Sequence, residues 1–118
     1  MTTQEVANRL IELSRQGKIK EVQKELFAAH AVSIEPNESM GPKIVNGLPA
    51  IIEKSILFDS VMEAFHGSKI SEPLVAGNYF SISWWLDTTM KGQGRIQMEE
   101  ICVYKVENGK IVSEQFFF

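Results

Sequence analysis

Hydrophobic residues recur every three or four positions through the first part of the chain. Val6, Leu10 and Leu13 form one such stripe, with charged residues on the opposite side, and Gly17 ends it. Residues 19–27 carry a second stripe. The pattern predicts two helices that meet near Gly17.

A third helix is predicted from Pro49 to about Phe65. Proline suits the first turn of a helix, because the N–H group that it lacks would have no partner there. The apolar stripe of this helix consists of Ile52, Ser55, Ile56, Asp59, Met62 and Phe65. Between the second and third helices, residues 31–36 are expected to form a short strand that ends at Pro36, and residues 37–46 a polar loop.

The second half of the chain has the pattern of β-strands. Aromatic and β-branched residues are concentrated there, and turns that contain glycine separate the runs. The predicted strands are residues 69–75, 79–90, 95–106 and 111–118. Consecutive hairpins make a curved antiparallel sheet, and helices followed by such a meander predict an α+β domain with its helices on one face of the sheet.

Apolar side chains are expected on both faces of this sheet. Trp84 and Trp85 are adjacent and therefore point to opposite faces, as do Phe117 and its two phenylalanine neighbours. The helices would cover only one face. We therefore expect a homodimer that buries the outer face of the sheet.

Composition and charge narrow the class of protein. The 118 residues are 44% hydrophobic and 23% charged, which is typical of one globular domain spanning residues 1–118. The net charge of −3 argues against binding to nucleic acid. No signal-peptide pattern and no apolar run of membrane-spanning length are present, so we expect a cytoplasmic protein that does not associate with membranes.

The cysteine and histidine content predicts no metal site. Cys102 is the only cysteine of the sequence, which excludes an internal disulfide and a cysteine-based zinc site. The two histidines, His30 and His66, stand without the acidic residues at the spacing that a metal would need.

Two segments resemble the nuclear-transport-factor-2-like superfamily, and in particular its SnoaL-like branch. Residues 100–118, EICVYKVENGKIVSEQFFF, resemble the closing hairpin of that branch, in which a Gly-Lys-Ile turn leads into an aromatic-rich last strand. Residues 27–36, FAAHAVSIEP, resemble the segment after the second helix. The resemblance covers essentially the whole chain. It implies a cone, with three N-terminal helices packed in the concave face of a strongly curved antiparallel sheet.

The resemblance also implies a mostly apolar pocket at the open end of the cone, for a small apolar or partly polar organic ligand. Members of the superfamily include polyketide cyclases and ketosteroid isomerases, so the implied reaction is a cofactor-free isomerisation, cyclisation or hydration that uses a carboxylate for proton transfer. The alternative is a non-catalytic ligand-binding or dimeric assembly module, because one fold serves many functions.

Two acidic residues are the first candidates for the catalytic base. Glu35 stands before Pro36, where the isomerases that this segment resembles carry their general base, although a solvated carboxylate at a strand end is the simpler interpretation. Asp87 interrupts an aromatic strand. It either projects into the pocket or pairs with Arg95 across the hairpin.

Two further residues are candidates for an assisting role. Glu100 shares its strand face with Met98 and Cys102, so burial would give it a partner or a raised pKa. His66 is expected at the end of the third helix, where it would either assist proton transfer in the pocket or interact with the helix dipole.

Two features depart from the ketosteroid isomerases. Counting back from Gly109 places the second acid of those enzymes at Cys102 rather than at Glu100. The tyrosine of their first helix has no match either, since Tyr79 and Tyr104 both lie in the strand half. Ketosteroid isomerase activity is therefore not expected.

Large apolar side chains are predicted to line the pocket. They are Phe58, Met62, Phe65, Trp85, Met98 and Tyr104. The competing interpretation places most of them in the core or in a dimer interface.

Overall fold

The computed structural model describes residues 1–39 and 41–118. Within them, the chain forms three helices and a seven-stranded sheet. The first helix, α1 (Thr3–Arg15), begins with reciprocal hydrogen bonds, because Glu5 N–H donates to Thr2 Oγ1 at 3.1 Å and Thr2 N–H donates to Glu5 Oε1 at 2.9 Å. Gly17, with a φ of 74°, makes the turn into α2 (Ile19–Leu26).

The third helix, α3 (Leu48–Val61), is shorter than predicted. Its expected extension to Phe65 is wrong, because Met62 begins β3 (Met62–Ile70), which pairs along its length with β5 (Tyr79–Met90). His66 consequently lies on a strand and does not end a helix. Pairing with a distant strand has overridden the local helical pattern.

Three other predicted boundaries differ from the structure. The strand expected at residues 69–75 is divided between the end of β3 and β4 (Leu74–Ala76), with Pro73 between them. The first strand, β1 (Phe27–Ile34), begins before residue 31. The expected polar loop contains β2 (Ile44–Asn46), which pairs antiparallel with β1.

The remaining strands, β6 (Gly94–Glu107) and β7 (Lys110–Phe117), form the predicted hairpins with β5. The strand order is β2-β1-β7-β6-β5-β3, and β4 pairs with β5. Neighbouring strands are antiparallel, except that β1 runs parallel to β7. This parallel pair joins the strand of the first half to the meander of the second half.

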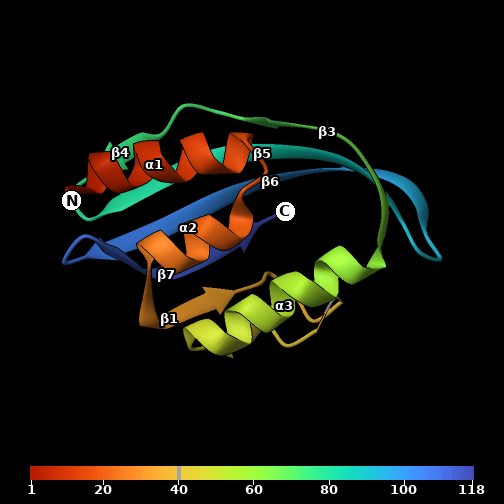
Figure 1. Cartoon of the computed structure of the whole chain (residues 1–118), viewed down its shortest axis with the longest axis horizontal. Helices are drawn as coiled ribbons and strands as arrows, with labels where there is room; N and C mark the ends of the chain where they lie inside the picture. The colour runs from red at the N-terminus through yellow and green to blue at the C-terminus, as the bar shows by residue number, and fades with distance from the viewer. Residues whose placement is uncertain (40) are drawn as a thin grey trace.

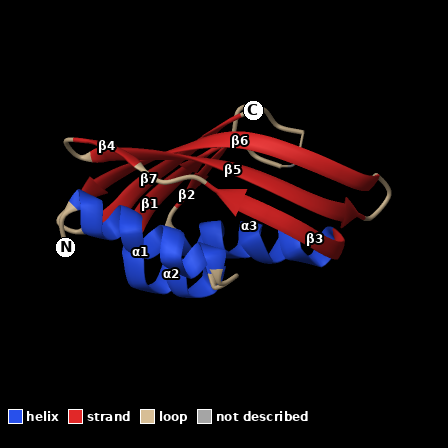
Figure 2. Cartoon of the chain, turned by 90° about the horizontal axis from the view of Figure 1, so that it is seen from above, coloured by secondary structure: helices blue, strands red, loops and turns tan. Residues whose placement is uncertain are grey.

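The helices lie against one face of a curled, unclosed sheet (Figures 1 and 2). This arrangement confirms the α+β cone predicted from the sequence. The core includes α1 residues such as Val6 and Leu10 packed with Phe80 and Tyr104 of the sheet, whose rings stack with centroids 4.7 Å apart. None of the helices in the described residues is long and apolar enough to span a membrane.

Alternation along β5 and β6 separates the two faces of the sheet. Phe80, Ile82 and Cys102 are buried on the concave face, and Glu100 shares their side of the sheet through its pairing with Trp84. The side chains of opposite parity point outward, and among them Ile101 is 53% exposed. The two sets of side chains along these strands therefore point to opposite sides of the sheet.

Candidate functional site

The concave face holds a group of charged and polar side chains that we call the concave-face cluster: Ser33, Glu35, Lys54, Glu100 and Glu114. Lys54 Nζ lies 2.5 Å from Glu35 Oε1 and donates to Ser33 Oγ at 2.9 Å. Ser33 Oγ in turn donates to Glu114 Oε2 at 3.1 Å. Lys54 of α3 is therefore connected to Glu114 of the sheet through the Ser33 hydroxyl.

Strand pairing and a loop contact position these residues. Ser33 on β1 is the register partner of Glu114 on β7, and Glu114 is in turn opposite Tyr104 on β6. Glu35 directly follows β1, and its backbone N–H donates to the Lys43 carbonyl at 2.8 Å. The concave-face cluster is thus assembled from β1, α3, β6 and β7.

The cluster extends from partly exposed to buried positions. The side chains of Glu35 and Lys54 are 22% and 30% exposed. Ser33 is fully buried and Glu114 is buried, while Glu100 is half-buried. A ligand that approaches from solvent would therefore meet Glu35 and Lys54 before Glu114.

Burial raises the pKa of the Glu114 carboxyl to about 7. The Lys54 ammonium and the Ser33 hydrogen bond act in the opposite direction, whereas the nearby Glu35 and Glu100 carboxylates raise this pKa further. The carboxyl of Glu114 therefore changes its protonation state near neutral pH, where a group can both accept and release a proton.

The pKa of the Glu100 carboxyl is also raised, and burial is the main cause. The Cys102 thiol, with Sγ 3.6 Å from Glu100 Oε1, lowers this pKa, and the Glu35 carboxylate raises it. Burial raises the pKa of the Cys102 thiol and of the Tyr104 hydroxyl as well. In this cluster, three carboxyl groups share one ammonium group, which favours retention of a proton among them.

A nearby hydrogen-bond donor is left free on the concave side. Trp84 Nε1 is buried and has no hydrogen-bond partner among the described residues. Such a group costs free energy unless a ligand or water satisfies it. Trp84 is the register partner of Glu100, so the two side chains emerge from neighbouring strands on the same face.

Glu35 and Glu100 are the two predicted site residues that the structure brings together. Asp87 lies away from them, on the outer face, where Arg95 Nε and Nη2 donate to its carboxylate oxygens at 3.0 and 2.7 Å. Of the two interpretations left open for Asp87, the structure shows the ion pair. His66 is exposed on β3, with Nε2 2.7 Å from Thr89 Oγ1.

Removal of Arg95 should destabilise the protein. The hydrogen bonds from Arg95 hold the pKa of the buried Asp87 carboxyl below its usual value. The pair therefore contributes stability that is present above the pKa of an unfolded aspartate, about 3.9, and is lost as the pH falls through the lower folded value. We expect Arg95→Met to unfold at lower denaturant concentration than wild type at pH 7, with the difference shrinking below pH 3. An equal difference at both pH values would contradict this account.

The predicted pocket residues are dispersed. Tyr104 is packed in the core against Phe80, while Phe65 is 60% exposed. Phe58, Met62 and Met98 are half-buried, and Met98 lies on the concave parity of β6. Trp85 has the outward parity, on the same side as Asp87.

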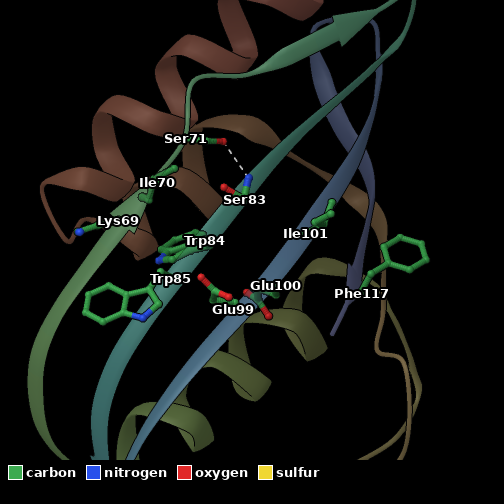
Figure 3. A pocket seen from close by; sticks show the side chains of 10 residues that line it. All are labelled: Lys69, Ile70, Ser71, Ser83, Trp84, Trp85, Glu99, Glu100, Ile101 and Phe117. Carbon is green, nitrogen blue, oxygen red and sulfur yellow. Dashed lines mark hydrogen bonds between the residues drawn. The ribbon is translucent and has the colours of Figure 1, made fainter.

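An open groove of about 500 Å³ crosses the sheet near Trp85 (Figure 3). Figure 3 shows it with the helices behind the sheet, Trp85 at one side and Phe117 at the other. Its lining is Lys69, Ile70, Ser71, Ser83, Trp84, Trp85, Glu99, Glu100, Ile101 and Phe117. This groove combines exposed apolar side chains with one lysine and one exposed glutamate.

The sequence analysis missed Ser33, Lys54 and Glu114. A signal for Glu114 was present, because it lies two residues before Phe116 and therefore shares its strand face. Lys54 follows the buried Ile51 by three residues, which places both on the same side of α3. Among the described residues, no group of three or more histidine, cysteine, aspartate or glutamate side chains is arranged to hold a metal ion.

Comparisons with known proteins agree with this architecture. A family model described as a SnoaL-like domain matches residues 1–118. A structure from Mesorhizobium loti, provisionally named a SnoaL-like polyketide cyclase, is 33% identical with a TM-score of 0.93, and the match covers 100% of both chains. No curated protein matches.

More distant structures share the fold. A protein of Catenulispora acidiphila with a ketosteroid isomerase-like fold, in complex with trimethylamine, is 19% identical with a TM-score of 0.75, over 99% of this chain and 87% of the other. An NTF2-like protein of unknown function from Burkholderia pseudomallei is 15% identical with a TM-score of 0.79, over 100% and 92%. The family model and the Mesorhizobium loti structure confirm the expected SnoaL-like family, and these distant structures show the same fold.

Proposed function

Because this chain belongs to the SnoaL-like family, we propose that its concave-face cluster binds a small organic molecule and moves a proton on it. The supporting observation is the connection of Glu35 to Glu114 through Lys54 and Ser33, with the Glu100 carboxyl nearby, at the side of the sheet covered by the helices. A set of carboxyl groups that can hold and release a proton suits an isomerisation, cyclisation or hydration that needs no cofactor.

Glu35 is the carboxylate that we assign as the base. Its side chain lies at the solvent end of the cluster and is 22% exposed. The Lys54 ammonium group lies beside its carboxylate oxygen Oε1. Glu100, whose pKa is raised by burial, would donate a proton or a hydrogen bond to an oxygen of the ligand. Asp87 is not part of this proposal, since Arg95 occupies its carboxylate on the outer face.

The names of structural neighbours support a small organic ligand. One neighbour is in complex with trimethylamine, and another, TerC, was co-crystallised with polyporic acid. The two ligands differ in charge and size, so they support the ligand class and leave its identity open. The cytoplasmic location stays a prediction.

Turnover of a chemical probe tests this proposal. The ring of 5-nitrobenzisoxazole opens when a base removes its carbon-bound proton, and the coloured phenolate product is followed by absorbance. We expect saturable turnover above the buffer rate by the wild-type protein, inhibited by small aromatic ligands. A rate equal to that of buffer across pH 5–9 would contradict the assignment of a catalytic base.

We also propose that the outer face of the sheet forms a homodimer. Ile101, Phe117 and Tyr79 are each about half exposed there, and Leu74 is 77% exposed. Lys69 and Glu99 flank Trp85 in one row across β3, β5 and β6. A two-fold axis near Trp85 would place each lysine beside the glutamate of the other copy, so the face is complementary to itself in charge.

A charged residue on this face should dissociate the dimer. We expect wild-type protein to sediment with twice the mass of the 13.3 kDa chain, and Phe117→Asp to sediment as a monomer. Ile56→Asp is the matched control, because Ile56 is 50% exposed on α3 and the helices lie on the opposite side of the sheet. A monomeric wild type, or an Ile56→Asp variant that dissociates equally, would contradict the proposal. A dimer without probe turnover would instead favour an assembly module.

A further inference from the structure

The hydroxyl of Ser33 connects Lys54 with Glu114 inside the concave-face cluster. Lys54 Nζ is 2.5 Å from Glu35 Oε1 and 2.9 Å from Ser33 Oγ, and Ser33 Oγ is 3.1 Å from Glu114 Oε2. Each step is within hydrogen-bond distance. The contacts therefore form a continuous chain of hydrogen bonds from Glu35 to Glu114.

The two ends of this chain differ in their access to solvent. The Glu35 side chain is 22% exposed, whereas Glu114 is buried and Ser33 has no exposed surface. A proton that reaches Glu114 therefore has a defined path through Ser33. Polar chains of this kind are strengthened in a low-dielectric interior, where each hydrogen bond polarises the next.

We propose that Lys54 and Ser33 relay protons between Glu35 and Glu114, so that buried Glu114 stores the proton that Glu35 takes from a ligand. This inference rests on the proposed function, because it assigns to Glu35 the proton that the ligand loses. Lys54 and Ser33 are positioning residues in this account, and neither removes a proton from the ligand.

The relay balances in both directions. With Glu114 ionised, the hydroxyl proton of Ser33 moves to Glu114 Oε2 while the Lys54 ammonium passes one proton to Ser33 Oγ. The Lys54 amine then has a free lone pair and takes the proton of protonated Glu35. One O–H bond breaks at Glu35 and one forms at Glu114. Lys54 ends as an ammonium and Ser33 as a hydroxyl. The reverse sequence returns the proton to Glu35 for delivery to the product.

The surroundings of Glu114 suit a proton store. Burial raises its pKa to about 7, so it binds a proton under conditions in which it can also release it. The groups that face it are the Lys54 ammonium of α3, Glu35 and Ser33 from the β1 side, and Glu100, Cys102 and Tyr104 of β6. Lys54 alone among these carries a positive charge, and it is the group through which the chain runs.

Carbon-13 NMR of the glutamate carboxyl groups tests the relay on the full chain without any ligand. In wild type we expect the Glu114 signal to move in a step near pH 7, and the Glu35 signal to respond to that step through the hydrogen bonds that connect the two groups. In Ser33→Ala, the Glu114 step should move to higher pH by about 0.5 to 1 unit, because a hydrogen bond that favours the ionised form is gone. The Glu35 signal should no longer follow that step.

Controls separate the relay from general effects. Ser113→Ala alters the β7 residue next to Glu114 on the other side of the strand, and both signals should depend on pH as in wild type. Lys54→Met breaks the chain at a second point and should uncouple the signals again. A Glu35 signal that does not respond to the Glu114 step in wild type, or a Ser33→Ala variant whose signals behave as in wild type, would overturn the relay. Because no ligand is present, this result is separate from probe turnover: absence of turnover contradicts the base role of Glu35 alone.

Discussion

Replacement of Glu114 by glutamine should make the protein more stable than wild type at pH 8 and should bring no such gain at pH 4. The folded pKa of Glu114 is raised to about 7 from an ordinary value of 4.5, mainly by burial. A carboxyl with a raised folded pKa contributes stability below the unfolded pKa, and this contribution is lost as the pH rises through the folded pKa. The loss in wild type therefore falls between about pH 4.5 and 7.

The difference between these two pKa values corresponds to about 3 kcal/mol of free energy of unfolding, at roughly 1.4 kcal/mol for each pKa unit. Glutamine is neutral at every pH and retains an oxygen that can accept the Ser33 hydrogen bond. The free energy of unfolding of Glu114→Gln, measured in urea relative to wild type, should thus change by about 3 kcal/mol in favour of the variant between pH 4 and pH 8.

The control for this comparison is Glu53→Gln, which removes an exposed carboxylate from α3, outside the concave-face cluster and the outer face of the sheet. Exposed substitutions usually change the free energy of unfolding by less than about 0.5 kcal/mol. A stability difference between Glu114→Gln and wild type that does not vary with pH would show that Glu114 is not a carboxyl of raised pKa.

Replacement of Glu35 by glutamine should abolish most of the proton transfer. The amide is nearly the same size as the carboxylate, but it cannot accept a proton at neutral pH. General base catalysis typically contributes about 100-fold to 10,000-fold, so we expect kcat/KM for ring opening of 5-nitrobenzisoxazole to fall by a factor in this range.

Two variants make this result specific to Glu35. Glu38→Gln removes an exposed carboxylate three residues along the same segment and should retain the wild-type rate. Asp87→Asn removes the carboxylate that pairs with Arg95 on the outer face, and it should also leave kcat/KM unchanged in protein that remains folded. Equal rates for Glu35→Gln and wild type would contradict the assignment, as would a loss of equal size in Glu38→Gln.

Local patterns predicted the elements that depend on near neighbours in the chain. The helix that contains Val6 and Leu10 and the hairpins of β5, β6 and β7 are of this kind, because periodicity and turn residues specify them locally. The first part of β3 was missed because Met62 and Phe65 continue a helical stripe. Pairing with β5 decides its conformation, and there Met62 and Phe65 meet residues more than 20 positions along the chain.

The same distinction applies to the site. Alternation along β6 correctly placed Glu100 with Cys102, and the burial of that face is observed. Glu114 was harder to predict from its strand, because the register between β6 and β7 shifts between Lys105 and Val106, so buried Ile111 and buried Glu114 are an odd number of residues apart. Lys54 was missed because a lysine on a helix normally indicates a solvated face.

The most direct test of the central proposal is to locate where a ligand binds. The measurement is the change in nitrogen-15 and proton NMR shifts of the labelled protein on addition of 5-nitroindazole, which has the shape of the probe but does not open. The account predicts that the largest changes occur at Ser33, Glu35 and Lys54. Changes confined to Lys69, Ile101 and Phe117 in the outer groove would contradict a functional site on the concave face.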